Sequence, residues 1–252
     1  MHLFRRFALL LAIFLPVIPA VTAQTTDSSS SSTQAGQAQQ PSGETEGQIN
    51  VQQRVRLRRE QRRAAAIHDA YDHKWETYID MGYLRFTPGP SQQRLTYYAW
   101  ETGLTQFRSE RLGLTLDGRG YYGTAFVGLN YTNITRPAIS QYDLLAGPTY
   151  RFYLQPKYSI SGRVLAGAGY ANFEGDTNGF KNMCPPPGQT GACLLYPNGV
   201  SFTASAAIIA EYNLTPSISF KLAPEYFFSD FGSTFQADRG FTAGMVYRFG
   251  KQ

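Results

Sequence analysis

The sequence predicts an all-β protein, an eight-stranded antiparallel transmembrane up-and-down β-barrel behind a disordered and helical N-terminal leader. Three observations lead to this prediction. Apolar and polar residues alternate through eight segments of at least ten residues each, whereas strands in soluble proteins average about five or six. Short and long connections alternate between these segments. Within the segments, the charged residues lie on one face, except for Arg85, Arg94 and Asp230 at segment ends. Together these features are typical of barrels that cross a membrane.

The first 23 residues predict a secretory signal peptide. Arg5 and Arg6 precede an apolar run at 7–18, and the small residues Val21 and Ala23 follow. A basic start, a short apolar stretch and a small-x-small end are the pattern of a cleaved export signal. A short anchor helix is the alternative, but the run falls below the ~18 residues that a spanning helix needs. We therefore expect the mature chain to be exported.

The next two segments form the rest of the leader. Residues 24–50 are rich in Ser, Thr, Gln and Gly and predict a disordered tether, because they have little apolar surface to bury. Residues 51–74 are dominated by helix formers and predict a short basic helix. Its arginines are Arg54, Arg56, Arg58, Arg59, Arg62 and Arg63.

The basic helix suggests an anionic partner. An envelope polymer or lipid head groups would suit this charge, and a merely solvated charged helix is the alternative. Nucleic acid is not expected as a partner of an exported chain.

The predicted barrel occupies residues 75–249. Its eight alternating segments are 76–86, 94–107, 112–124, 139–154, 158–173, 199–213, 217–230 and 240–249. A tilted membrane-spanning strand needs about 9–11 residues, and each segment has them. The connections are short after the second, fourth and sixth segments and longer after the others. Both termini would then lie with the short turns, on the periplasmic side.

The charged residues of the segments alternate in phase and predict a polar interior. Six acidic and five basic residues share the small and polar face: Asp80, Glu101, Asp117, Arg119, Asp143, Arg151, Arg163, Glu211, Lys221, Glu225 and Arg248. A Lys or Arg facing lipid at mid-bilayer would cost about 2–4 kcal/mol. We therefore expect these groups to point inward and to form salt bridges with one another. A soluble lipocalin-like barrel would show the opposite arrangement, with its apolar face inside.

Aromatic residues on the apolar face support a membrane location. They lie near segment ends, where interfacial girdles occur: Tyr98, Trp100, Tyr122, Tyr142, Tyr150, Tyr158, Tyr170, Tyr212, Tyr226 and Tyr247.

The longest connection, 174–198, contains the only two cysteines, Cys184 and Cys193. In an exported chain these predict a disulfide that staples the loop. Two free thiols are the alternative.

The last segment ends with Met245-Val246-Tyr247-Arg248-Phe249. With its eight segments, the chain resembles the small eight-stranded outer-membrane β-barrels of bacteria, the OmpA/OmpX-like family, over about 75–249. The resemblance implies the barrel fold and an outer-membrane location. It also implies that Met245, Tyr247 and Phe249 belong to a C-terminal signal read by the barrel-assembly machinery.

The function classes left open are a structural or surface-interaction protein and a narrow channel for ions or very small solutes. An enzyme is not expected, because the three histidines, His2, His68 and His73, all precede the predicted barrel and a Ser-His-acid site needs one. Gly118–Gly123 matches a dinucleotide-binding spacing but lacks the following helix that such a site needs. No cofactor or metal is expected.

Overall fold

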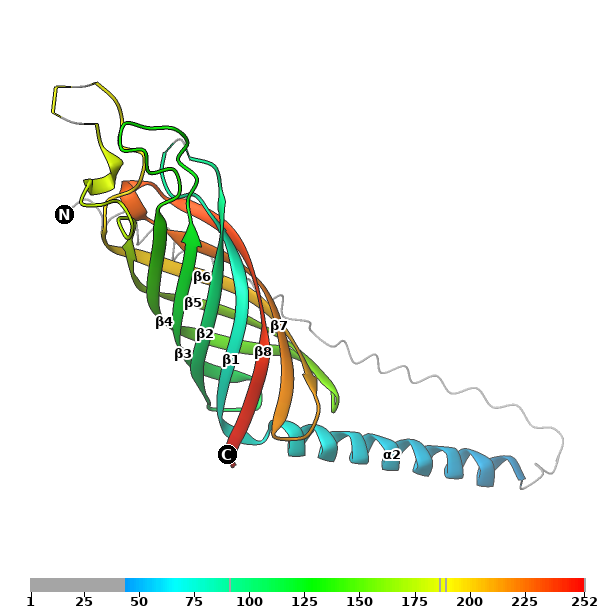
Figure 1. Cartoon of the computed structure of the whole chain (residues 1–252). Coiled ribbons are helices and arrows are strands. Elements are labelled where there is room, and N and C mark those ends of the chain that lie inside the picture. Colours follow the sequence, from blue (N-terminus) through cyan, green and yellow to red (C-terminus); the bar gives the residue numbers. More distant parts are fainter. Residues whose placement is uncertain (1–43, 91, 186, 189, 252) are drawn as a thin grey trace, which may run out of the picture. The chain divides into compact units, whose positions relative to one another are not determined.

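The chain forms a closed barrel of eight antiparallel strands, each hydrogen-bonded to the next in the order β1 to β8 (Figure 1). In this computed structural model, residues 44–90, 92–185, 187–188 and 190–251 are described. The predicted signal peptide and residues 24–43 of the predicted tether lie outside them. The strands are β1 (His73–Phe86), β2 (Leu95–Phe107), β3 (Leu112–Thr124), β4 (Ala138–Leu154), β5 (Tyr158–Asn172), β6 (Gly199–Asn213), β7 (Ile218–Ser229) and β8 (Gln236–Lys251). The predicted fold class is confirmed.

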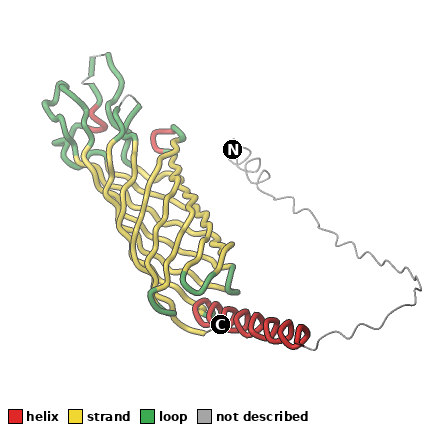
Figure 2. The backbone as a smooth tube through the Cα atoms, turned by 90° about the vertical axis from the view of Figure 1, so that its right-hand side faces the viewer, coloured by secondary structure: helices red, strands yellow, loops and turns green. Residues whose placement is uncertain are grey.

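The helix α2 (Glu44–Tyr71) precedes the barrel (Figure 2). It begins seven residues before the predicted helical segment and ends three residues before that segment does. Among the described helices, none is both long and apolar enough to cross a membrane.

The first and last strands close the barrel. Trp75 on β1 pairs with Phe249 on β8, and the register continues to Arg85 opposite Arg239. The short connections are 108–111, 155–157 and 214–217, and the long ones are 87–94, 125–137, 173–198 and 230–235. Figure 2 shows the long loops gathered at one end of the barrel. We call this end the long-loop rim and the opposite end the short-turn rim.

The outer wall of the barrel is apolar. Met81, Tyr98 and Val200 are 72–74% exposed, although burial would be the usual fate of such side chains in water. All ten aromatic residues of the predicted girdles are exposed on this wall. A contiguous apolar wall with aromatic residues toward its ends is the surface that a lipid bilayer covers.

The prediction of a polar interior holds for only part of the barrel. Toward the long-loop rim it holds a buried apolar cluster in which Phe86 and Tyr97 stack with ring centroids 4.9 Å apart. Loop residues close over it, with Phe173 5.7 Å from Phe231 and 6.0 Å from Tyr196 between ring centroids. We call Phe86, Tyr97, Tyr121, Phe173, Tyr196, Phe227 and Phe231 the aromatic plug. It fills the lumen near the long-loop rim, because loops lying on the barrel mouth need an apolar surface to pack against.

Candidate functional site

The eleven charged residues predicted for the interior all lie inside the barrel. All are buried, and the most exposed of them, Glu211, is only 8% exposed. Two further inward acids, Glu76 and Asp238, were not predicted. Glu76 lies four residues before Asp80, and Asp238 lies two residues before Gly240, so both keep the period of two. Extending the alternation to the segment ends would have predicted them.

Arg119 on β3 lies at the centre of the larger group of charges. Its Nε donates to Asp117 Oδ1 at 2.5 Å and its Nη1 donates to Glu225 Oε2 at 2.8 Å. Its Nη2 also lies 3.7 Å from Glu101 Oε2. Since β3 and β7 are not neighbours in the sheet, the contact with Glu225 spans the lumen. One guanidinium therefore ties several walls of the barrel together.

Two more cations complete this group. Arg163 donates to Glu101 Oε1 at 2.7 Å and lies 3.4 Å from Asp117 Oδ2. The Nζ of Lys221 is 2.5 Å from Asp80 Oδ2 and 3.4 Å from Glu101 Oε1. We call Asp80, Glu101, Asp117, Arg119, Arg163, Lys221 and Glu225 the central cluster, which contains four acids and three bases.

A tyrosine that the sequence analysis missed joins the central cluster. Tyr78 donates its hydroxyl to Asp117 and accepts from Arg163 Nη1 at 2.7 Å. The Nζ of Lys221 lies 3.6 Å from the centroid of its ring. Tyr78 shares the inward phase of Asp80, but a tyrosine also fits the lipid-facing girdle, so composition alone could not place it.

A second, neutral group lies near the short-turn rim. Glu76 accepts from Arg151 and, at 2.6 Å, from Arg248, which also pairs with Glu211. Tyr71, the last residue of α2, is fully buried against this group, with the guanidinium carbons of Arg151 and Arg248 each 5.0 Å from its ring centroid. The end of the helix thus covers the lumen from this side.

Asp143 takes no part in these pairs. Both its carboxylate oxygens accept from Gln141 Nε2, at 3.1 and 3.0 Å, and it forms no ion pair with any residue that the structure describes. Arg119, which directly opposes it in the β3–β4 register, is engaged by Asp117 and Glu225 instead.

Little free space remains around the charges. The interior cavity lined by Tyr78, Thr105, Arg163 and Lys221 has a volume of about 20 Å³. That is enough for one water molecule, which needs roughly 10–15 Å³. The described interior is therefore packed with side chains between the aromatic plug and Tyr71.

The predicted cysteines are joined in a disulfide, Cys184–Cys193. The loop that contains them is tied down by Glu174, whose carboxylate accepts from the backbone N–H of Asn182 at 3.0 Å and from Asn198 Nδ2 at 2.9 Å. Its far end bonds to the first long loop, since Tyr196 N donates to the carbonyl of Pro88 at 3.0 Å. The loop is thus a packed lid on the barrel mouth.

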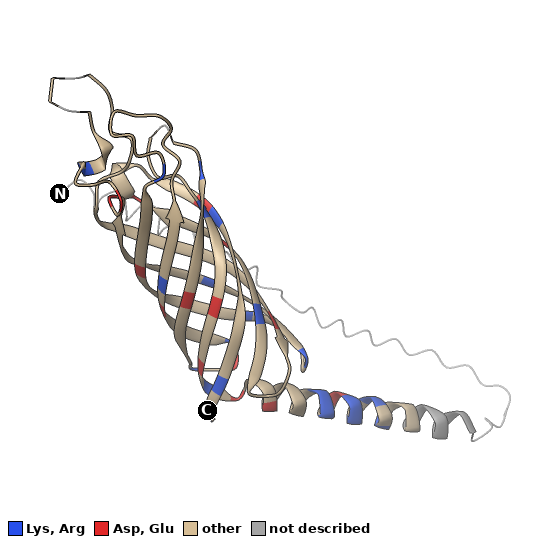
Figure 3. Cartoon of the chain, viewed as in Figure 1, with Lys and Arg blue, Asp and Glu red and all other residues tan. Residues whose placement is uncertain are grey.

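The remaining predicted residues lie on the outside. Met245, Tyr247 and Phe249 project outward from β8, with the last two rings stacked 5.9 Å apart between centroids. The six leader arginines are exposed on α2, where they form the blue bands of the helix in Figure 3. Of these, Arg63 donates to Gln155 at the short-turn rim.

His73 is the first residue of β1, inside the barrel domain rather than before it as expected, and it lies at the short-turn rim. Within the described part of the chain, no group of three His, Cys, Asp or Glu residues is placed to hold a metal ion.

No protein-family model matches the sequence, and no curated protein matches it. The structure is similar to those of small outer-membrane barrels. Neisserial surface protein A is 12% identical over 70% of this chain and 97% of its own, with a TM-score of 0.47. OprG from Pseudomonas aeruginosa is 11% identical over 71% and 98%, with a TM-score of 0.46. Ail of Yersinia pestis, in complex with the heparin analogue sucrose octasulfate, is 15% identical over 70% and 99%, with a TM-score of 0.42.

Proposed function

We propose that this protein is a bacterial outer-membrane barrel that does not conduct, with a structural role in the envelope or a recognition role carried by its surface loops. One observation carries the proposal. The lumen is filled along its length by Tyr71, the two charge groups and the aromatic plug, and the cavity among the charges holds about one water molecule. Eight strands enclose a space that side chains can fill.

The orientation follows from the connections. Barrels of this kind carry short turns on the periplasmic side and long loops outside. Export by the signal peptide would place both barrel ends, His73 and Lys251, in the periplasm, because these residues pair with each other at the short-turn rim. The disulfide-stapled loop would then face the medium, where disulfides persist.

A narrow channel is the second candidate, and one observation favours it. Two oxygens of the central cluster, Asp80 Oδ1 and Glu101 Oε2, are buried and have no hydrogen-bond partner among the residues that the structure describes. Buried polar atoms normally have partners, and a file of water through the lumen would supply them. The acid excess of the central cluster would make such a channel prefer cations.

Conductance separates the two candidates. The folded full chain would be added to a planar bilayer, with the difference in gel mobility between boiled and unboiled samples as the proof of folding. We expect the folded protein to produce no channel openings. Steady discrete openings would overturn the proposal and make the central cluster a lumen lining.

The partners are proposed on the same basis. The exposed arginines of α2 suit anionic lipid head groups or an acidic envelope polymer, and the outward aromatic residues of β8 suit recognition by the assembly machinery. Replacing Arg54, Arg58 and Arg62 with Gln should weaken co-sedimentation with vesicles containing phosphatidylglycerol. The unchanged heat-dependent gel shift of the same variant would show that the barrel itself is intact.

A further inference from the structure

Two arginines face each other on the lipid-exposed wall at the long-loop rim. Arg85 on β1 lies directly opposite Arg239 on β8 in the antiparallel register, and both side chains are exposed. Like charges placed directly opposite each other destabilise a sheet. Arg85 donates one hydrogen bond to Thr96 Oγ1 at 2.9 Å, Arg239 lies 5.6 Å from the ring centroid of Tyr226, and neither pairs with a carboxylate among the described residues.

The depth of this arginine pair is set by aromatic neighbours. One step down the same face, Tyr83 opposes Phe241, with ring centroids 6.4 Å apart. Aromatic residues of this kind mark the boundary between hydrocarbon and head groups. Arg85 and Arg239 therefore lie one step beyond the boundary, at the level of the lipid head groups.

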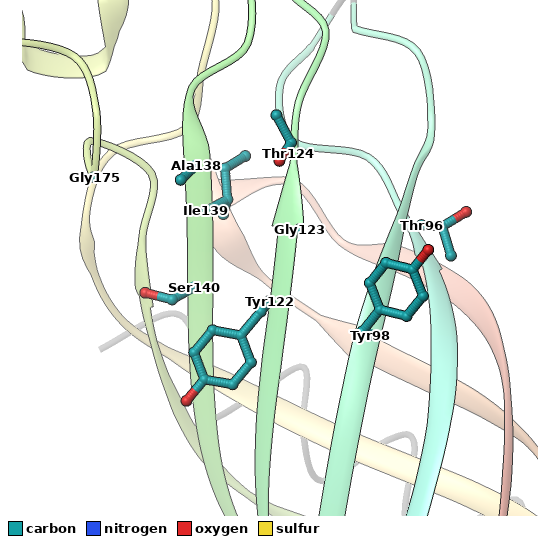
Figure 4. A pocket seen from close by; sticks show the side chains of 9 residues that line it. All are labelled: Thr96, Tyr98, Tyr122, Gly123, Thr124, Ala138, Ile139, Ser140 and Gly175. Carbon is teal, nitrogen blue, oxygen red and sulfur yellow. The ribbon is translucent and has the colours of Figure 1, made fainter.

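A groove across β2, β3 and β4 adjoins Arg85 through Thr96, although neither arginine lines it. It has a volume of about 550 Å³ and includes Thr96, Tyr98, Tyr122, Thr124 and Ser140 in its lining. Figure 4 shows Tyr98 and Tyr122 on neighbouring strands, with Thr96 beside Tyr98 and Thr124 beside Gly123. Hydroxyl groups and aromatic rings together are the surface that a sugar ring needs, because a sugar presents both hydroxyls and C–H faces. Thr96 belongs to the groove and also bonds to Arg85, so the two parts form one site.

We propose that this site binds a phosphorylated glycolipid of the outer leaflet, with its phosphate on Arg85 and Arg239 and its sugar in the groove. Arginine suits phosphate because its planar fork donates two parallel hydrogen bonds. Bound phosphate would also remove the repulsion between the paired cations. The acyl chains would lie along the apolar wall below Tyr83 and Phe241. This inference rests on the proposed outer-membrane location, which places the long-loop rim in the outer leaflet.

The test measures lipid binding by the detergent-folded full chain. Its probes are diphosphoryl lipid A, the same lipid after enzymatic removal of its phosphates, and phosphatidylglycerol. We expect the diphosphorylated lipid to bind at least about tenfold more tightly than the dephosphorylated form, since a charged hydrogen bond to phosphate is lost. Binding of the diphosphorylated lipid should also raise the unfolding temperature of the barrel. Equal binding of the two glycolipids would overturn the role of the phosphate without any variant being made.

Variants then locate the site. Arg85→Gln with Arg239→Gln should abolish the preference for the phosphorylated lipid, whereas Arg108→Gln with Arg111→Gln, an equal charge change at the short-turn rim, should leave it unchanged. Thr124→Val with Ser140→Ala should weaken the glycolipid more than phosphatidylglycerol. If the unmodified protein binds phosphatidylglycerol as tightly as diphosphoryl lipid A, the assignment of the groove to a sugar is overturned.

The inference and the proposed function fail in different ways. If the unmodified chain shows no heat-dependent gel shift, the outer-membrane barrel itself is contradicted. If it shows the shift and stays silent in a bilayer, yet binds both glycolipids equally, only the lipid site is contradicted. A double arginine variant that fails to fold leaves the comparison of the three lipids on the unmodified protein as the deciding measurement.

Discussion

Arg119 on β3 donates a hydrogen bond to Glu225 on β7, with 2.8 Å between Nη1 and Oε2, across the lumen of the barrel. The two residues are 106 positions apart in the chain, and both are buried. A paired charge buried in this way does not need to stabilise the fold relative to an apolar residue, but removing one partner leaves the other charge uncompensated. The contact therefore acts as a cross-brace between opposite walls.

Replacing Arg119 with Met should destabilise the barrel by about 3–5 kcal/mol, because Asp117, Glu225 and Glu101 would lose a cation in a site with little water. The measurement is the urea dependence of the heat-modifiable gel shift. The control is Arg136→Met, since Arg136 is exposed on a long loop and its loss should change stability little. An unfolding midpoint for Arg119→Met equal to that of the control would contradict the brace.

A double-mutant cycle would separate the pair from the rest of the central cluster. Arg119→Met together with Glu225→Gln should cost clearly less than the sum of the two single changes, because the second change removes the charge that the first one strands. We expect the interaction energy to fall in the range of about 0.5–3 kcal/mol that contacting residues show. Additive effects would mean that Asp117 and Glu101 alone hold Arg119.

The period of two could predict which face each residue occupies, since strand geometry alternates side chains locally. That is why all eleven charged residues lie inside. It could not predict pairing across the lumen, because closure of the barrel brings Arg119 and Glu225 together and no local pattern records it. For the same reason no local pattern could predict that Asp143 bonds to Gln141 instead of a cation.

The aromatic plug escaped prediction for a different reason. Near the long-loop rim, Leu84 and Phe86 point into the barrel and Tyr83 points outward, so both faces of β1 carry apolar side chains there. The alternation of polar and apolar residues, which distinguishes the inner from the outer face elsewhere, is therefore lost. The apolar residues Met183 and Leu195 in the longest loop were the one remaining indication that the barrel mouth is apolar. Such a loop has to pack on something, and the barrel mouth is the surface next to it.

Phe173→Ala should loosen that lid. Phe173 is fully buried and contacts Phe86, Tyr196 and Phe231, at 6.1, 6.0 and 5.7 Å between ring centroids. Deleting a buried phenylalanine ring typically costs about 3–5 kcal/mol. We expect a lower unfolding temperature and faster proteolysis within 174–198. Phe235→Ala serves as the control, because Phe235 is 66% exposed. Equal proteolysis of the two variants would show that the lid does not depend on the plug.

The disulfide should order the loop tip without supporting the barrel. Cys184 and Cys193 are nine positions apart, and closing a loop of this size contributes about 2–3 kcal/mol. Replacing both cysteines with Ser should speed tryptic cleavage after Lys181 and leave the heat-dependent gel shift unchanged. Reduction of the unmodified protein should reproduce the effect and should do nothing to the serine variant. A serine variant that loses its gel shift would place the disulfide in the folding of the barrel itself.

The contact between α2 and the turn 108–111 should depend on pH. His68 Nδ1 lies 2.7 Å from Glu110 Oε1, and this hydrogen bond, together with the charge of Asp72, raises the pKa of His68 above its ordinary value of 6.5. A raised pKa means that protonated His68 favours the docked helix. The contribution is therefore complete below pH 6.5 and is lost as the pH rises through the raised pKa.

Titration of the His68 ring by NMR would measure this coupling. Glu110→Gln should bring the pKa of His68 down toward 6.5, because it removes the main cause of the shift. Glu60→Gln, which removes an exposed carboxylate two turns earlier in α2, should leave it nearly unchanged. In the unmodified protein, tryptic cleavage after Arg63 should accelerate above the raised pKa, since docking of the helix end protects this bond. If the unmodified protein and the Glu110→Gln variant are cleaved at the same rate at every pH, the helix end is held without His68. Its remaining contacts are the bonds of Tyr71 to the carbonyl of Gln155 and to Asn213, and the bond of Arg63 to Gln155.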